Sequence, residues 1–177
     1  TVISLIPQYD SISPQQHNLS LVATDALLWD SEVQKSIVAG NYLHDFMATI
    51  KESKDVDKEL AMLEKRGIFP KETREALLKT AKAIVSHPDL APLFTGEDEV
   101  LCERDILSAS GEILRPDRIN IHSGNTVTLI DYKTGDPQAS HNRQITLYAE
   151  ALSEMGYHVK RKILLYCKEA SITLQEN

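Results

Sequence analysis

Residues 115–135, RPDRINIHSGNTVTLIDYKTG, contain the pattern from which the fold is predicted. Residues 113–121 and 126–132 are rich in β-branched side chains and partly alternate between apolar and polar, which predicts two strands. The short segment 123–125, Ser-Gly-Asn, is a turn signal, so the two strands are expected to pair as an antiparallel hairpin. A β-sheet is therefore the predicted centre of the molecule.

The segments around this hairpin supply helices before it and a helix and strands after it. Apolar residues at a spacing of about 3.6 predict the helices, and continuous apolar runs predict further strands. The predicted elements are helices over 31–50, 55–66, 71–86 and 141–155, and further strands over 98–107, 159–167 and 171–174.

The order of these elements predicts one α/β domain with a mixed sheet. Within residues 1–177, we expect an irregular lead-in over 1–30, a helical part over 31–95, and a sheet core with one helix over 96–177. A length of 177 residues fits one domain. The chain begins at Thr1 rather than Met, which suggests a piece excised from a longer protein.

Composition excludes several classes of protein. With 42% hydrophobic and 25% charged residues, the chain is neither disordered nor fibrous. No apolar run approaches the ~20 residues of a membrane span, so no membrane partner is expected. The two cysteines, Cys102 and Cys167, are too few for a four-cysteine iron–sulfur cluster, and none is expected; they are interpreted as buried apolar thiols.

Charge is distributed unevenly along the chain. The net charge of −7 argues against a protein that coats polyanions. Residues 115–168 nevertheless carry 8 basic and 5 acidic side chains, a net of +3, which leaves −10 for the remainder. This stretch is either a solvated surface or a local phosphate-binding surface.

Asp117, Asp131 and Lys133 are the strongest chemical signal. Asp131 and Lys133 are two apart on a strand and share a face, and the hairpin can bring Asp117 beside Asp131. Two carboxylates ~4 Å apart repel by about 4 kcal/mol at an effective dielectric constant of 20. A proton or a cation relieves that repulsion, and hard oxygen ligands suit Mg²⁺ or Mn²⁺. Alternatively, Asp131 and Lys133 form a surface ion pair worth ~0–1 kcal/mol.

Two helices carry weaker signals. Gly40 and His44 are one turn apart, and the glycine leaves room for a backbone, a metal or a substrate beside the histidine. Gln144 and Tyr148 share a helix face and could bind a phosphate or hold a lysine. The alternatives are an exposed helix histidine and an ordinary amphipathic helix.

Glu103 is a charged residue in an otherwise apolar strand and needs a partner. It either joins the metal cluster or pairs with Arg104 or Arg118.

Together these residues resemble the PD-(D/E)XK nuclease superfamily, and specifically its RecB-like branch. The motifs occur in the family's order and span roughly residues 36–150. They are Gly40-x-x-x-His44, Glu103, Pro116-Asp117-Arg118-Ile119, Ile130-Asp131-Tyr132-Lys133-Thr134-Gly135 and Gln144-x-x-x-Tyr148.

The resemblance implies a restriction-endonuclease-like fold, a central mixed sheet flanked by helices. It implies that Mg²⁺ or Mn²⁺ is bound by His44, Asp117, Asp131 and the backbone carbonyl of Tyr132. Lys133 is then the catalytic lysine. The other implied catalytic residues are Asp117, Asp131 and, less directly, Glu103, and the residues expected to bind or orient DNA are Gln144, Tyr148, Arg118 and Arg143.

The activity implied is metal-dependent hydrolysis of DNA phosphodiester bonds. Relatives in this branch are often exonuclease domains of bacterial helicase–nucleases of the RecBCD and AddAB type, which act in double-strand-break repair and recombination. The expected partners are single-stranded or unwound DNA ends and helicase domains in the same chain or complex, in the bacterial cytoplasm at the nucleoid. The alternatives are a binding or helicase-interacting module without catalysis and a small-molecule phosphohydrolase.

Overall fold

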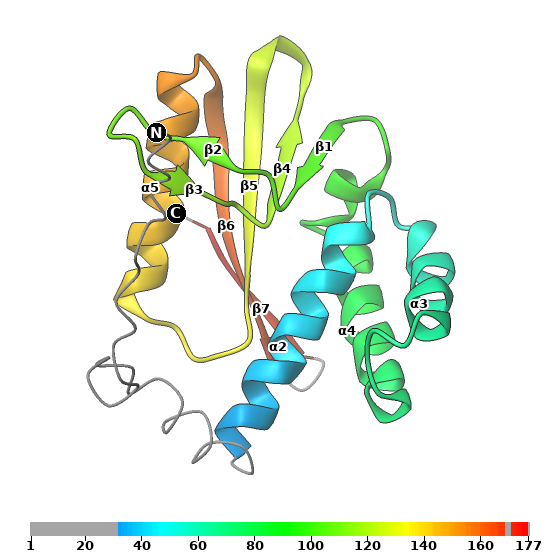
Figure 1. The fold of residues 1–177 in the computed structure, drawn as a ribbon. Helices are drawn as coiled ribbons and strands as arrows, with labels where there is room; N and C mark the ends of the chain where they lie inside the picture. The colour runs from blue at the N-terminus through cyan, green and yellow to red at the C-terminus, as the bar shows by residue number, and fades with distance from the viewer. Residues whose placement is uncertain (1–31, 169–170, 177) are drawn as a thin grey trace, which may run out of the picture. The chain divides into compact units, whose positions relative to one another are not determined.

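The computed structural model describes residues 32–168 and 171–176, and Ser36–Asn177 form one compact unit to which the following description applies. The lead-in predicted over residues 1–30 lies outside the described residues. Three helices come before the sheet, as predicted, and are drawn in blue to green in Figure 1. They are α2 (Glu32–Thr49), α3 (Asp55–Lys65) and α4 (Arg74–Ser86), with short 3₁₀ turns η1 (Lys71–Thr73) and η2 (Ala91–Phe94).

The ends of these helices follow from local sequence. After α3, Gly67 adopts a φ of 68°, and its N–H donates to the Glu64 carbonyl, which closes the last turn. After α4, His87 is extended because the following Pro88 disfavours helical backbone before it. None of the helices in the described part of the chain combines the length and apolar character that a membrane crossing requires.

The central sheet has five strands in the order β1-β4-β5-β6-β7. β5 and β6 run parallel because helix α5 connects them, and the other neighbouring strands are antiparallel. The predicted mixed sheet flanked by helices is therefore confirmed. The bounds are β1 (Glu99–Cys102), β4 (Arg118–Ile121), β5 (Thr126–Lys133), α5 (Ala139–Glu154), β6 (His158–Lys168) and β7 (Ser171–Glu176).

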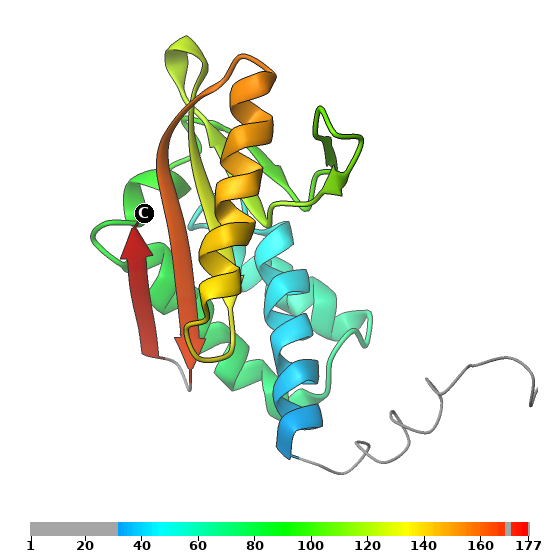
Figure 2. The same ribbon diagram turned by 90° about the vertical axis from the view of Figure 1, so that its left-hand side faces the viewer.

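Two predicted strands are wrong as continuous elements. The stretch 98–107 breaks at Glu103, whose φ of 48° is left-handed and ends β1. The stretch 113–121 breaks around Pro116, which has no N–H for a sheet ladder. The detached pieces, β2 (Ile106–Leu107) and β3 (Ile113–Leu114), pair as a separate hairpin that projects beside α5 in Figure 2. Asp117 consequently lies just before β4, not inside a strand.

Each face of the sheet is covered by its own apolar cluster, because side chains alternate along the strands. α5 packs on one face against Leu129 and Leu164, while α2, α3 and α4 pack on the other against Ile130 and Ile163. Figure 1 shows α5 and the pair α3 and α4 on opposite sides of the strands. By this alternation, Asp131 lies on the same side as Leu129, which faces α5, and Asp117 continues that side just before β4. Arg118 pairs with Ile130 and lies on the other face.

Candidate metal centre

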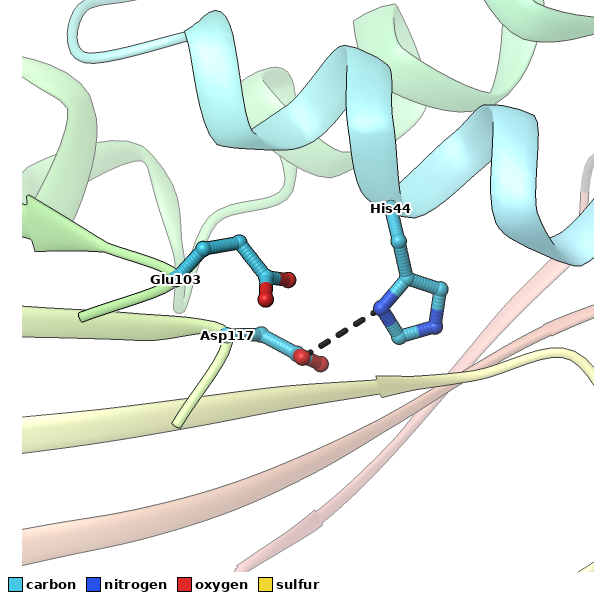
Figure 3. Close-up of side chains that lie close together, drawn as sticks. All are labelled: His44, Glu103 and Asp117. Atoms are coloured by element: carbon cyan, nitrogen blue, oxygen red, sulfur yellow. Dashed lines mark ion pairs between the residues drawn. The ribbon is translucent and has the colours of Figure 1, made fainter. Parts of the chain in front are cut away.

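Three side chains that are distant in sequence converge at the end of the β1–β4 pair. One ligand atom each from His44, Glu103 and Asp117 can be chosen so that all lie within 4.8 Å of one another. His44 Nδ1 is 3.3 Å from Asp117 Oδ1. Figure 3 shows the imidazole approaching from α2 and the two carboxylates from the chain beside the strand ends.

The backbone brings the two carboxylates together. The N–H of Glu103 donates to the carbonyl of Asp117 at 3.1 Å, which extends the β1–β4 ladder by one pair. Glu103 and Asp117 are also the two ends of the segment that carries the β2–β3 hairpin. At the base of that hairpin, Arg115 donates to both carboxylate oxygens of Asp105, at 2.6 and 3.1 Å, which ties its two arms together.

Helix α2 brings His44 to the carboxylates. A Cβ at Gly40 would lie 2.6 Å from Thr134 Oγ1, so only glycine allows the helix this close to the end of β5. One turn later, the His44 ring meets the Tyr132 ring edge-on, with centroids 6.1 Å apart. The sequence predicted a close approach at Gly40, but it did not identify Thr134 as the neighbour.

Asp117 is oriented by both of its oxygens. Oδ1 faces His44, and Oδ2 accepts the N–H of Tyr132 at 2.6 Å. The second contact joins the Asp117 side chain to the backbone of β5, directly after Asp131. The pairing of Arg118 with Ile130 sets this register.

A second row of polar groups continues from Asp131 onto helix α5. Lys133 Nζ lies 2.6 Å from Asp131 Oδ2 and donates to Gln144 Oε1 at 2.8 Å. Gln144 Nε2 then donates to the Tyr148 hydroxyl at 2.7 Å. The Asp131 and Lys133 side chains are only 3% and 17% exposed, so the alternative of a surface ion pair is wrong.

The pKa values of the acids reflect this crowding. Burial, followed by the charge of Asp117, raises the pKa of Asp131 to about 6, although Lys133 acts against the rise. The pKa of Glu103 is also raised, by burial and then by the charge of Asp117. Burial alone would lower the pKa of His44, but its hydrogen bond to Asp117 and the acidic charges nearby raise it. The site therefore has more negative charge than its own cations neutralise.

These residues fit a divalent cation. One imidazole and several carboxylate oxygens are ligands of Mg²⁺ or Mn²⁺. Within the described residues, the buried Asp131 Oδ2 has no partner besides the Lys133 ammonium. A cation near Asp117 would offset the repulsion that adds to the effect of burial in raising the two pKa values.

The predicted site residues separate into three groups. His44, Glu103 and Asp117 come together directly, and Glu103 lies with these ligands rather than with Arg104 or Arg118. Asp131, Lys133, Gln144 and Tyr148 form the adjoining row of contacts. The carbonyl of Tyr132 as a ligand remains a prediction.

The predicted contact between Arg118 and DNA is wrong. Its side chain is 0% exposed and donates to the carbonyls of Ile50, Lys51 and Leu93 on the face away from Asp117. The spacing of Arg118 and Asn120 signals this burial, since both fall on the face opposite Ile119. Arg143 lies exposed on α5, and its contact with DNA remains a prediction.

The mixed sheet with an imidazole–carboxylate cluster and a neighbouring half-buried lysine defines a metal-dependent hydrolase of the restriction-endonuclease-like class. Residues 16–175 match the family model of the PD-(D/E)XK nuclease superfamily, and the chain belongs to that superfamily. This membership confirms the predicted superfamily and fold. It implies hydrolysis of phosphodiester bonds, use of a divalent metal, and binding of nucleic acid.

Comparison with individual proteins adds the following. No curated protein matches the sequence. Among solved structures, 11 chains match. One of them, titled "Crystal structure of SSO0001", has 16% sequence identity and a TM-score of 0.33, and the match covers 84% of this chain and 78% of that chain.

Proposed function

We propose that this protein is a Mg²⁺- or Mn²⁺-dependent deoxyribonuclease whose site consists of His44, Glu103, Asp117, Asp131 and Lys133. The single observation that carries this proposal is the convergence of His44, Glu103 and Asp117 within 4.8 Å, from three separate parts of the chain. Asp131 and the carbonyl of Tyr132 complete the proposed ligand set. A divalent cation there supplies Lewis acidity, which neutralises phosphoryl charge and lowers the pKa of a water molecule.

The residues of the chain then divide the work. Asp117 is oriented by the Tyr132 N–H and keeps Oδ1 directed toward His44. Lys133 carries a positive charge between Asp131 and Gln144, where its ammonium can orient water and stabilise the negative charge that develops on phosphate. Tyr148 and Gln144 position the lysine. His44 must be neutral to act as a ligand, so activity falls as pH drops.

We further propose that residues 1–177 form one RecB-like nuclease domain that works with a helicase in DNA repair and recombination. The order of the five motifs between Gly40 and Tyr148 supports this role. The proposed location is the bacterial cytoplasm, at the nucleoid. Helicase motifs encoded directly before Thr1, or in a neighbouring gene, would support it. A gene context without any helicase would count against it.

Cleavage of labelled linear and circular single-stranded DNA, with and without Mn²⁺, tests the activity. An exonuclease degrades only the linear strand, and a matched RNA strand tests the preference for DNA. Asp117→Asn should remove the activity, whereas Asp57→Asn, at an exposed ion pair with Lys82 away from the site, should retain it. Binding of DNA without metal-dependent cleavage would favour a module that has no catalytic role.

A further inference from the structure

We propose that Arg118 is a positioning residue that sets the separation of His44 and Asp117 and thereby the affinity of the site for its metal; the inference rests on the proposed function. We call Arg118, Asn120, Phe94 and the carbonyls of Ile50, Lys51 and Leu93 the Arg118 network. It lies on the sheet face opposite Asp117.

The Arg118 network begins one residue after the ligand Asp117. Nη1 of Arg118 donates to the Ile50 carbonyl at 2.6 Å, and Nη2 donates to the carbonyls of Lys51 at 3.0 Å and Leu93 at 2.7 Å. Nε donates to Asn120 Oδ1 at 2.8 Å. The guanidinium carbon also lies 4.0 Å from the centre of the Phe94 ring. Every nitrogen of the guanidinium therefore has an acceptor.

Two of these acceptors directly follow helix α2. That helix ends at Thr49, so the carbonyls of Ile50 and Lys51 lie just past its last turn. The C-terminal end of a helix has carbonyls without partners and a partial negative charge, which a guanidinium satisfies. His44 lies less than two turns before this end. Arg118 thus joins the end of the helix that carries His44 to the strand that follows Asp117.

A second set of bonds fixes Arg118 itself. Asn120, two residues further along β4, donates to the Leu93 carbonyl at 2.8 Å and to Asp98 Oδ2 at 3.0 Å. Asn120 is 0% exposed, and its orientation leaves Oδ1 directed at Arg118. The guanidinium therefore has one fixed direction relative to β4. A displacement of α2 would break its bonds to Ile50 and Lys51.

Stability alone is a poor reason for this arrangement. Within the described residues, Arg118 forms no ion pair with a carboxylate, although it is fully buried. A buried charge is costly to remove from water, and buried polar or ionic groups can serve to specify one geometry rather than to add stability. A planar fork that reaches three carbonyls fixes an angle as well as a distance, which a lysine ammonium cannot do. The geometry fixed here is the 3.3 Å approach of His44 to Asp117.

The test measures Mn²⁺ binding by electron paramagnetic resonance and does not depend on cleavage. Arg118→Lys keeps the charge but loses the fork, and it should weaken Mn²⁺ binding about 10–100-fold. In a His44→Ala background the same change should cost little, because the positioned ligand is already gone. The absorption spectrum of bound Co²⁺ should also change in Arg118→Lys, since it reports coordination geometry.

Leu60→Ala is the control for lost stability. Leu60 is fully buried in α3, in the apolar cluster that also contains Phe94 of the Arg118 network, and its side chain has no polar group. The Leu60→Ala change should lower the melting temperature while leaving Mn²⁺ affinity and the Co²⁺ spectrum unchanged. If Arg118→Lys does not fold, Asn120→Ala is tested in its place. The Asn120→Ala change removes one acceptor of the guanidinium but keeps Arg118 itself. We then expect a smaller loss of Mn²⁺ affinity than for Arg118→Lys.

The outcomes distinguish this inference from the proposed function. A folded Arg118→Lys or Asn120→Ala protein that binds Mn²⁺ as tightly as the wild type would overturn the positioning role alone. An equal loss of affinity in the presence and absence of His44 would also overturn it. A wild-type protein that binds no Mn²⁺ would overturn the proposed metal centre, and the positioning role with it.

Discussion

The Arg118 network and the candidate metal centre are built from neighbouring residues, yet they differ in how well their polar groups are matched by partners. Around Arg118, each nitrogen of the guanidinium meets an acceptor, and the group is completely buried. Around Asp117, the carboxylates of Glu103, Asp117 and Asp131 face fewer cations than their charge requires, and two of their pKa values are raised. A balanced polar network fixes structure, whereas carboxylates that outnumber the neighbouring cations, two of them buried, mark a place for a cation.

Removing an acid from the metal centre should have the largest effect. Asp131→Asn should reduce metal-dependent cleavage on the order of 10³-fold or more, since it removes a proposed ligand and the partner of Lys133. The metal-free protein should be no less stable, because the change removes like-charge repulsion. Cleavage assays and thermal unfolding check both results. Unchanged cleavage would contradict the assignment of Asp131.

Removing the lysine should separate catalysis from metal binding. Lys133→Met should slow cleavage about 10²–10³-fold, because the charge that faces the phosphate is lost. Mn²⁺ binding should persist, since Lys133 is a cation and not a ligand. Single-turnover cleavage and Mn²⁺ titration measure the two properties. Lys168→Met is the control, at an exposed lysine paired with Asp136, and should leave both unchanged.

Crowding helix α2 should disturb its contact with the end of β5 and thereby the position of His44. Gly40→Ala places a methyl group 2.6 Å from Thr134 Oγ1, and overpacking of this kind costs about 1–3 kcal/mol. The gain in helix propensity, ~1 kcal/mol, offsets only part of it. Urea unfolding and Mn²⁺ titration should therefore show lower stability and weaker binding.

Two further variants check the cause of that effect. Thr134→Ala combined with Gly40→Ala should restore both properties, because the clashing oxygen is removed. Gly135→Ala is the matched control, since no heavy atom lies within 4 Å of its added Cβ. If Gly40→Ala bound Mn²⁺ normally, the close approach of α2 to β5 would be irrelevant to the site.

The charge imbalance of the metal centre also predicts a dependence on pH. Because the pKa of Asp131 is raised to about 6, the folded protein binds this proton more tightly than the unfolded chain does. The group therefore costs stability as pH rises from about 4 to 6, and the cost is full above that window. The raised pKa of His44 acts in the same direction, since its contribution is lost as pH rises through the folded-state value.

Comparison of the wild type with Asp131→Asn isolates this dependence. Without metal, the variant should melt at a higher temperature than the wild type at pH 8, by about 2–4 °C for each kcal/mol of this cost, and at nearly the same temperature at pH 4. The stabilisation of the wild type by Mn²⁺ should increase with pH, because the ligands must be deprotonated. If the wild type and Asp131→Asn differed in melting temperature by the same amount at every pH in this range, the raised pKa of Asp131 would be contradicted.

The smallest expected effect concerns the surface around the site. Arg143→Ala should weaken DNA binding only a few-fold and reduce the slope of log K against log salt by about 1, as expected for one phosphate contact. Fluorescence anisotropy in Ca²⁺ at several salt concentrations measures this slope. Lys79→Ala, at an exposed position on α4, should leave the slope unchanged. An identical slope in both variants would remove Arg143 from the proposed interface.

Much of the architecture could be predicted because it depends on local patterns. The apolar repeat of α2, the glycine after α3 and the apolar runs of β5 and β6 identify their own elements. The strands around Glu103 and Pro116 could not be bounded in this way. A left-handed residue and a missing N–H interrupt them, and only the pairing of β1 with β4 shows where each strand stops.

The chemistry of the site could be inferred from the residue types alone, because a carboxylate, an imidazole or an ammonium keeps its properties wherever the chain places it. The order of the motifs also determined the superfamily. The three-dimensional arrangement was needed to show that Glu103 joins His44 and Asp117, and that Arg118 turns away into the helical layer. The physical reason is that the direction of a side chain depends on strand register and on contacts with elements distant in the chain. Asp117, just before β4, and Arg118, its first residue, continue the alternation of the strand and point in opposite directions.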